Sequence, residues 1–97
     1  MITIHIRDGL AINPDGSIHR SYDPPVGTII NFIAEDGNEY HIVACSDSGS
    51  YCRDCVFDDH VGHPLSKLFN GRCGPDVTQI RCYDRVYKPI DDIMENL

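Results

Sequence analysis

The amino-acid sequence predicts a small α+β domain that is mostly β: an antiparallel sheet of hairpins with one or two short helices and a cysteine-rich loop. Three features lead to this prediction. Residues 1–45 contain short runs of alternating apolar and polar side chains, which is the pattern of half-buried strands. Turn signals containing Gly, Asp and Pro separate these runs. Residues 89–97 instead repeat apolar side chains at helical spacing.

The first segment, residues 1–25, is expected to form an N-terminal strand and hairpin. In "MITIHI" the three isoleucines fall on one face, because successive side chains of a strand alternate between faces. In "NPDG", residues 13–16, Pro14 fixes a turn φ and Gly16 accepts a left-handed conformation. This turn should join "GLAI" to "SIHRSY", and "DPP" at 23–25 then ends regular structure.

The clearest predicted element is a hairpin within "GTIINFIAEDGNEYHIVAC", residues 27–45. Asp-Gly between two β-rich runs is a strong hairpin signal. A two-residue turn would place Ile33 opposite Tyr40. A three-residue loop, residues 36–38, gives a cleaner apolar face and is preferred. It aligns Ile30, Phe32 and Ala34 with Tyr40, Ile42 and Ala44.

The remaining chain is expected to form a loop, a helix, a strand and a second helix. "CSDSGSYCRDC" is small and polar, and "HPLSKLFNG" has Pro near a helix start and Asn-Gly at its end. "DVTQIRCYDRVY" reads as a strand that buries Val77, Ile80 and Val86. We therefore expect one domain, 1–97, with a cysteine-containing core at 26–88 and a short C-terminal helix at 89–97. Its apolar stripe is Ile90, Ile93, Met94 and Leu97.

Charge disfavours several classes of partner. Eight Lys and Arg residues stand against fifteen Asp and Glu residues, giving a net charge of -7. The basic residues are scattered, so nucleic-acid binding is not expected, whereas another protein remains a possible partner. The N-terminus lacks a signal-peptide pattern and no apolar run could span a bilayer. We expect a cytoplasmic protein of unassigned oligomeric state, in a compartment that keeps thiols reduced.

The cysteines suggest a structural zinc site. Cys52, Cys55, Cys73 and Cys82 give the spacing C-x2-C-x17-C-x8-C. A C-x2-C turn can direct two sulfurs at one tetrahedral ion, and the two later cysteines would complete the site. His60 or His63 could replace a cysteine ligand. The x8 spacing differs from that of a zinc ribbon, so only the first half of the pattern is a standard knuckle.

Two other interpretations of the cysteines stay open. Disulfides would staple the domain, although five cysteines and no export signal do not favour a secreted framework. A redox pair would use Cys52 and Cys55, but Asp54 disfavours a thiolate and no helix start follows the motif. Cys45, at the end of a predicted strand, reads as a small buried hydrophobe.

No phosphate-binding loop or paired-carboxylate motif is present, so the sequence makes no positive case for an enzyme. The expected function is a protein-interaction or accessory module that performs no chemistry. The alternatives are a thiol–disulfide redox protein and a disulfide-stapled binding domain.

The pattern "VGTIINF…DGNEYHIVAC…YCRDCVF…GRC…IRCYDRVY" resembles a loose group of short uncharacterised proteins from gut bacterial and phage genomes, over residues 26–88. These have a Gly-started hairpin, C-x-x-C followed by an aromatic residue, two more cysteines and an Arg-containing terminal strand. This chain departs in its long segment between Cys55 and Cys73. The resemblance implies a compact cysteine-stapled domain and implies no reaction. The matching positions are Gly27, Gly37, Cys52, Cys55, Phe57, Cys73, Cys82 and Arg85.

Overall fold

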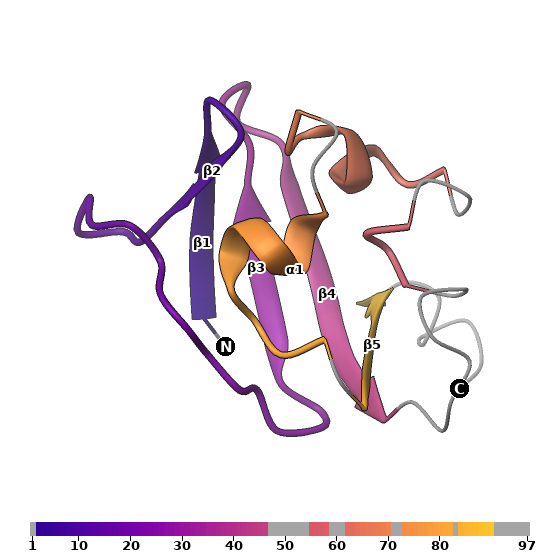
Figure 1. The fold of residues 1–97 in the computed structure, drawn as a ribbon. Helices are drawn as coiled ribbons and strands as arrows, with labels where there is room; N and C mark the ends of the chain where they lie inside the picture. The colour runs from indigo at the N-terminus through magenta and orange to yellow at the C-terminus, as the bar shows by residue number, and fades with distance from the viewer. Residues whose placement is uncertain (1, 47–54, 59–61, 71–72, 83, 91–97) are drawn as a thin grey trace.

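A computed structural model of the protein describes residues 2–46, 55–58, 62–70, 73–82 and 84–90. Within these residues the chain forms a five-stranded mixed sheet with the order β2-β1-β3-β4-β5, and α1 lies in front of it in Figure 1. The protein is thus mostly β, as predicted, with one short α-helix and one 3-10 turn among the described residues. The elements are β1 (Ile2–Arg7), β2 (Leu10–Ile12), β3 (Ile29–Ile33), β4 (Glu39–Ser46), η2 (Pro64–Lys67), α1 (Gly74–Thr78) and β5 (Arg85–Pro89).

The predicted antiparallel sheet of hairpins is a mixed sheet in the structure, because β1 and β3 run parallel whereas the other three pairs are antiparallel. β1 turns into β2 at Asp8 and Gly9, which both adopt positive φ, as a tight two-residue hairpin turn requires. The predicted hairpin around "NPDG" is reduced to a single bridge between Ile12 and Ile18. The chain then crosses over against α1, where the amide of Tyr22 donates to the Gln79 carbonyl, before it enters β3. Parallel neighbours need such a crossover.

The hairpin of β3 and β4 has the predicted apolar face but not the predicted pairs. Phe32 lies opposite Tyr40 and Ile30 opposite Ile42, so the loop spans residues 34–38 and is longer than three residues. Two backbone bonds close it: the Ala34 amide donates to Asn38, and the Gly37 amide donates to Ala34. The apolar face is the same as predicted, because a shift of the strand register by two residues keeps each side chain on the same side of its strand.

The segment after β4 differs most from expectation. The predicted strand at 76–87 begins instead as α1, because Pro75 suits the first helical turn and Asp76 lies favourably near its N-terminal dipole. Gln79 ends this helix in the left-handed conformation, and strand structure resumes at β5. The predicted helix at 63–71 is shorter, a 3-10 turn. Pro89, the expected start of the last helix, ends β5, and residues 91–97 lie outside the described residues.

One face of the sheet carries the core. Its side chains are covered by residues 55–57, by η2 and its following turn, and by the segment after α1. Phe57 and Phe69 both meet Phe32 edge-on, with centroids 5.8 and 6.3 Å apart, and Phe57 meets Tyr87 at 5.7 Å. Ile80 and Val86 are buried as predicted, and Val77 packs against the core while half-buried. The buried cluster is Ile4, Ile6, Ala11, Ile30, Phe32, Ile42, Ala44, Cys55, Val56, Phe57, Leu65, Phe69, Ile80, Val86 and Tyr87.

Candidate functional site

Three of the four cysteines predicted to bind zinc lie in the described part of the chain: Cys55, Cys73 and Cys82. Cys52 and His60 lie outside it. Each of the three described cysteines has a neighbouring residue that contacts the core, and these contacts fix the position of the cysteine backbone.

Cys55 opens a short segment that is fastened to β5. It is only 4% exposed, and its carbonyl accepts a hydrogen bond from the Asp58 amide at 2.9 Å, which closes a turn. The Val56 amide donates to the Tyr87 carbonyl at 2.7 Å on the open edge of the sheet. Val56 and Phe57 are both buried, so the position of Cys55 is fixed by apolar packing on both sides of that bond.

Cys73 is the exposed N-cap residue of α1, directly before Gly74. The ring of Phe57 packs so closely on Gly74 that a Cβ atom there would lie 2.2 Å from the ring Cδ1. Glycine is required at this approach because any side chain would overlap the ring. Since Phe57 is two residues from Cys55, this contact holds the Cys55 and Cys73 backbones in one region.

Cys82 joins the same region through Tyr87. The Cys82 carbonyl accepts from the Arg85 amide at 3.3 Å, at the start of β5, and the Tyr87 hydroxyl donates to the Arg81 carbonyl. Burial raises the pKa of Tyr87, and the negative charge that Cys55 and Cys82 would carry as thiolates raises that pKa further.

These contacts place the segments that carry the three cysteines, which are separated by up to 27 positions in the sequence, against the contact between Phe57 and Tyr87, without gathering the three side chains into one cluster. Within the described residues, no group of three or more His, Cys, Asp or Glu side chains is gathered closely enough to hold a metal ion. The predicted set of four also needs Cys52, which stands outside those residues. Phe57 was named from the sequence only as a position of the resemblance, and Gly74 and Tyr87 were not identified as supporting residues. The sequence signal for Gly74 and Phe57 was that each lies within two residues of a cysteine, in "CGP" and "CVF".

His63, a predicted substitute ligand, serves as a helix cap. Its Nδ1 accepts a hydrogen bond from the Leu65 amide at 3.0 Å, and its ring meets Tyr40 edge-on at 5.6 Å. An accepting Nδ1 places the ring proton on Nε2 in the neutral imidazole, so metal binding through Nε2 would require loss of this cap.

Cys45 lies in β4, half-buried, where its thiol donates to the Val43 carbonyl at 3.8 Å. It packs against the core, which agrees with its expected role as a small hydrophobe.

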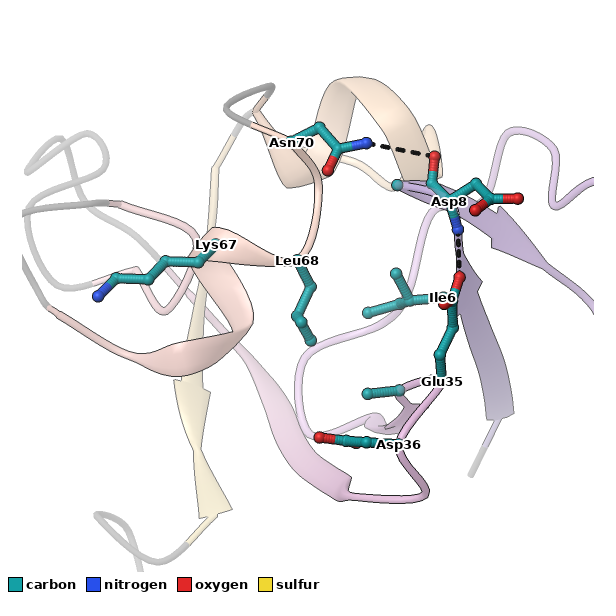
Figure 2. A pocket seen from close by; sticks show the side chains of 9 residues that line it. Ile6, Asp8, Glu35, Asp36, Lys67, Leu68 and Asn70 are labelled. Carbon is teal, nitrogen blue, oxygen red and sulfur yellow. Dashed lines mark hydrogen bonds between the residues drawn. The ribbon is translucent and has the colours of Figure 1, made fainter.

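A pocket of about 440 Å³ lies at the other end of the sheet, where β1 and the loop after β3 meet η2. Figure 2 shows the Glu35 carboxylate accepting the Asp8 amide and the Asn70 amide donating to the Asp8 carbonyl, while the Lys67 side chain extends away from the carboxylates. Because β1 and β3 are parallel, the residues that follow them reach the same edge of the sheet. The pocket was not predicted from the sequence, because it depends on the parallel pairing of β1 and β3. Its lining residues are Ile6, Asp8, Gly9, Ala34, Glu35, Asp36, Lys67, Leu68 and Asn70.

The pocket offers little chemistry. Its apolar floor, Ile6 and Ala34, is almost fully buried, and its carboxylates are exposed to solvent. Asp36 is also occupied by Asn38, whose backbone and side-chain amides both donate to it at 2.9 Å. The exposed carboxylates can attract a cation, but the lining residues include no buried polar side chain that would bind one specific ligand.

A scan against protein-family models found no match, and searches of curated proteins and of solved structures found none. In the part of the chain that the structure describes, no helix has the length and apolar character needed to cross a membrane. The assignment of function therefore depends on the geometry of the chain itself.

Proposed function

We propose that the protein is a non-catalytic protein-interaction or accessory module whose C-terminal half is held together by a structural zinc ion. Cys52, Cys55, Cys73 and Cys82 are the proposed ligands, with Cys52 assigned from the C-x2-C spacing alone. A zinc ion bound by four thiolates has no open coordination position, so it would contribute to folding and perform no chemistry.

The proposal is supported by the anchoring of the three described cysteine segments on one core contact: the Val56 amide donates to the Tyr87 carbonyl, the Tyr87 hydroxyl donates to the Arg81 carbonyl, and Phe57 packs on Gly74 next to Cys73. Three segments with little regular structure meet there. A small domain buries a limited share of its surface, so a metal crosslink between such segments would add stability where helices and strands do not.

The redox alternative is supported less well. A thiol that attacks a substrate disulfide must be accessible as a thiolate, whereas Cys55 is 4% exposed and lies among buried apolar side chains. Burial in apolar surroundings favours the neutral thiol unless a metal ion replaces the proton. The proposed cytoplasmic location, with reduced thiols, is consistent with metal binding.

The test is the intact mass of protein purified without reductant, measured under native and then denaturing conditions. The proposal predicts one zinc ion per chain that is lost on denaturation. A metal-free mass reduced by two hydrogens per cysteine pair would show disulfides instead, and a metal-free, fully reduced mass would exclude both.

The matched variants are Cys73→Ser and Cys82→Ser, with Cys45→Ser as the control. The first two should lower the zinc content below one ion per chain and lower the melting temperature by at least ~10 °C, which corresponds to roughly 2 kcal/mol in a domain of this size. The control should retain zinc. Equal zinc content in all three variants would contradict the ligand assignment.

A further inference from the structure

The sheet has a second face, here called the outer face, whose side chains point away from the core. Strand alternation places Thr3, His5, Asn31 and His41 on it, whereas Ile4 and Phe32 point into the core. The register aligns its side chains in rows across the strands. These rows are Ile29–Val43–Lys88, Thr3–Asn31–His41 and Ile12–His5–Ile33–Glu39.

Phe57, Phe69 and α1 cover the core face, whereas on the outer face only the Cys45–Val86 pair next to β5 is packed into the core cluster among the described strand residues. Phe57 and Phe69 contact Phe32, and α1 lies on the viewer's side of β3 and β4 in Figure 1. The outer face nevertheless carries Ile29, Ile33 and Val43, which are only half-buried and are not among the residues packed on the core cluster. Ile29 and Val43 are adjacent in one row, and Ile33 lies on the other side of the polar Thr3–Asn31–His41 row, so the face carries two small apolar areas that a partner could cover.

A buried polar group in the middle of this face has an unused acceptor. Asn31 is 6% exposed, and its Nδ2 donates to Glu39 Oε1 at 2.9 Å. Its Oδ1 is buried and has no hydrogen-bond partner. Buried acceptors are normally paired, so an unpaired one in the central strand indicates a donor supplied from outside the described residues. His41, the register partner of Asn31 on β4, is exposed.

Charge selects the kind of partner. The chain has a net charge of -7, yet Glu39 is the only acid among the described strand residues of the outer face. Lys88, Arg7 and two histidines lie on the same face. Two copies of this chain repel each other over most of their surfaces but not here.

From this arrangement we infer that the outer face is the contact surface between two copies of the chain. A two-fold axis that runs across the strands, through the Thr3–Asn31–His41 row, exchanges the two flanking rows. It sets Ile29 of one copy against Ile33 of the other, and Lys88 beside Glu39 of the other. The same axis sets Val43 opposite Glu39 of the other copy, so the complementary contacts are the Ile29–Ile33 and Lys88–Glu39 pairs, each formed twice as an isologous interface requires.

The same axis sets each Asn31 opposite its copy. Asn31 Nδ2 has a second hydrogen beyond the one donated to Glu39, so each amide can donate to the unpaired Oδ1 of the other. This pairing rests on the proposed interaction role of the protein but is independent of zinc, because Cys55, Cys73 and Cys82, the proposed ligands in the described residues, lie in segments that pack on Phe57 and Tyr87.

The size of the face sets the expected strength. Strands ~4.8 Å apart with a rise of ~3.3 Å per residue give five short strands a projected area of roughly 400 Å². This is below the ~800 Å² per partner of a standard stable interface. We therefore expect a weak dimer, with a dissociation constant in the micromolar range or above.

The experiment is sedimentation velocity on reduced, zinc-supplemented protein from ~1 µM to ~1 mM, with Glu39→Lys and Lys88→Glu as separate variants. Each reversal places like charges together at both ends of the interface and should weaken the dimer about tenfold. An equimolar mixture of the two variants restores both opposite-charge pairs, so it should dimerise where neither variant alone does. Asp76→Lys, on the exposed surface of α1, is the control and should leave the dimer at wild-type strength.

A wild-type chain that stays monomeric up to ~1 mM overturns the inference. So does a dimer that survives both reversals, since it uses another surface. Glu39→Lys also removes the hydrogen bond that Asn31 donates to Glu39, so this variant could be destabilised. Thermal melts therefore establish that each variant is folded. Zinc content measured on the same samples separates the two proposals: a zinc-bound monomer refutes only the dimer, and a metal-free dimer refutes only the zinc site.

Discussion

Replacement of Gly74 by alanine should destabilise the protein, although alanine is the better helix former. Alanine gains about 1 kcal/mol over glycine inside a helix. The new Cβ, however, would lie 2.2 Å from Cδ1 and 2.7 Å from Cε1 of Phe57, against a favourable carbon–carbon separation of ~3.5–4.0 Å. The Phe57 ring cannot retreat freely, since Phe32 and Tyr87 pack edge-on against it. Overpacking a core costs about 1–3 kcal/mol, and more where the displaced group is enclosed.

The net effect should be a loss of roughly 2 kcal/mol, seen as a fall of ~8–16 °C in melting temperature for a domain of this size. Urea denaturation of zinc-supplemented wild type, Gly74→Ala, Phe57→Leu and the double variant measures it. The smaller Leu side chain gives the Cβ room, so the double variant should be more stable than the sum of the single losses predicts. A Gly74→Ala protein as stable as wild type would refute the close contact, and with it the support for placing Cys73 near Cys55.

Two further predictions concern a cap and a buried phenol. His63→Ala should lower the free energy of unfolding by about 1 kcal/mol through loss of the cap on the Leu65 amide, whereas His63→Asp should retain the cap. Chemical denaturation measures both variants. Loss of zinc in His63→Asp would instead identify His63 as a metal ligand. Burial raises the pKa of Tyr87, so the folded state binds this proton more tightly than the unfolded state, and stability should fall as pH rises above ~10. Tyr87→Phe should flatten that alkaline loss relative to wild type in urea titrations at pH 8–11, and equal slopes would contradict it.

The fold was predictable where short-range pattern decides it. Alternation placed Ile4, Ile30 and Phe32 on one buried face, and "EDG" located the turn between β3 and β4. The helix α1 was missed because its five residues are too few for a periodic signal, and its Val77 suits a strand as well as a helix. The loop length of the hairpin was also missed, since a shift of two residues leaves the same face buried.

The sequence by itself determined the mostly β class, the apolar face of the sheet, the acidic charge and the cysteine spacing, because each depends on neighbouring residues or on composition. Only the tertiary structure decided which distant segments meet. The parallel pairing of β1 and β3 needs a crossover connection, so it depends on contacts between residues far apart in the chain. The same pairing brings the carboxylates of the pocket to one edge of the sheet. Likewise, the approach of the segments that carry Cys55 and Cys73 follows from Phe57 packing on Gly74, and the rows of the outer face follow from register. Both depend on contacts between residues far apart in the chain, which spacing along it does not encode.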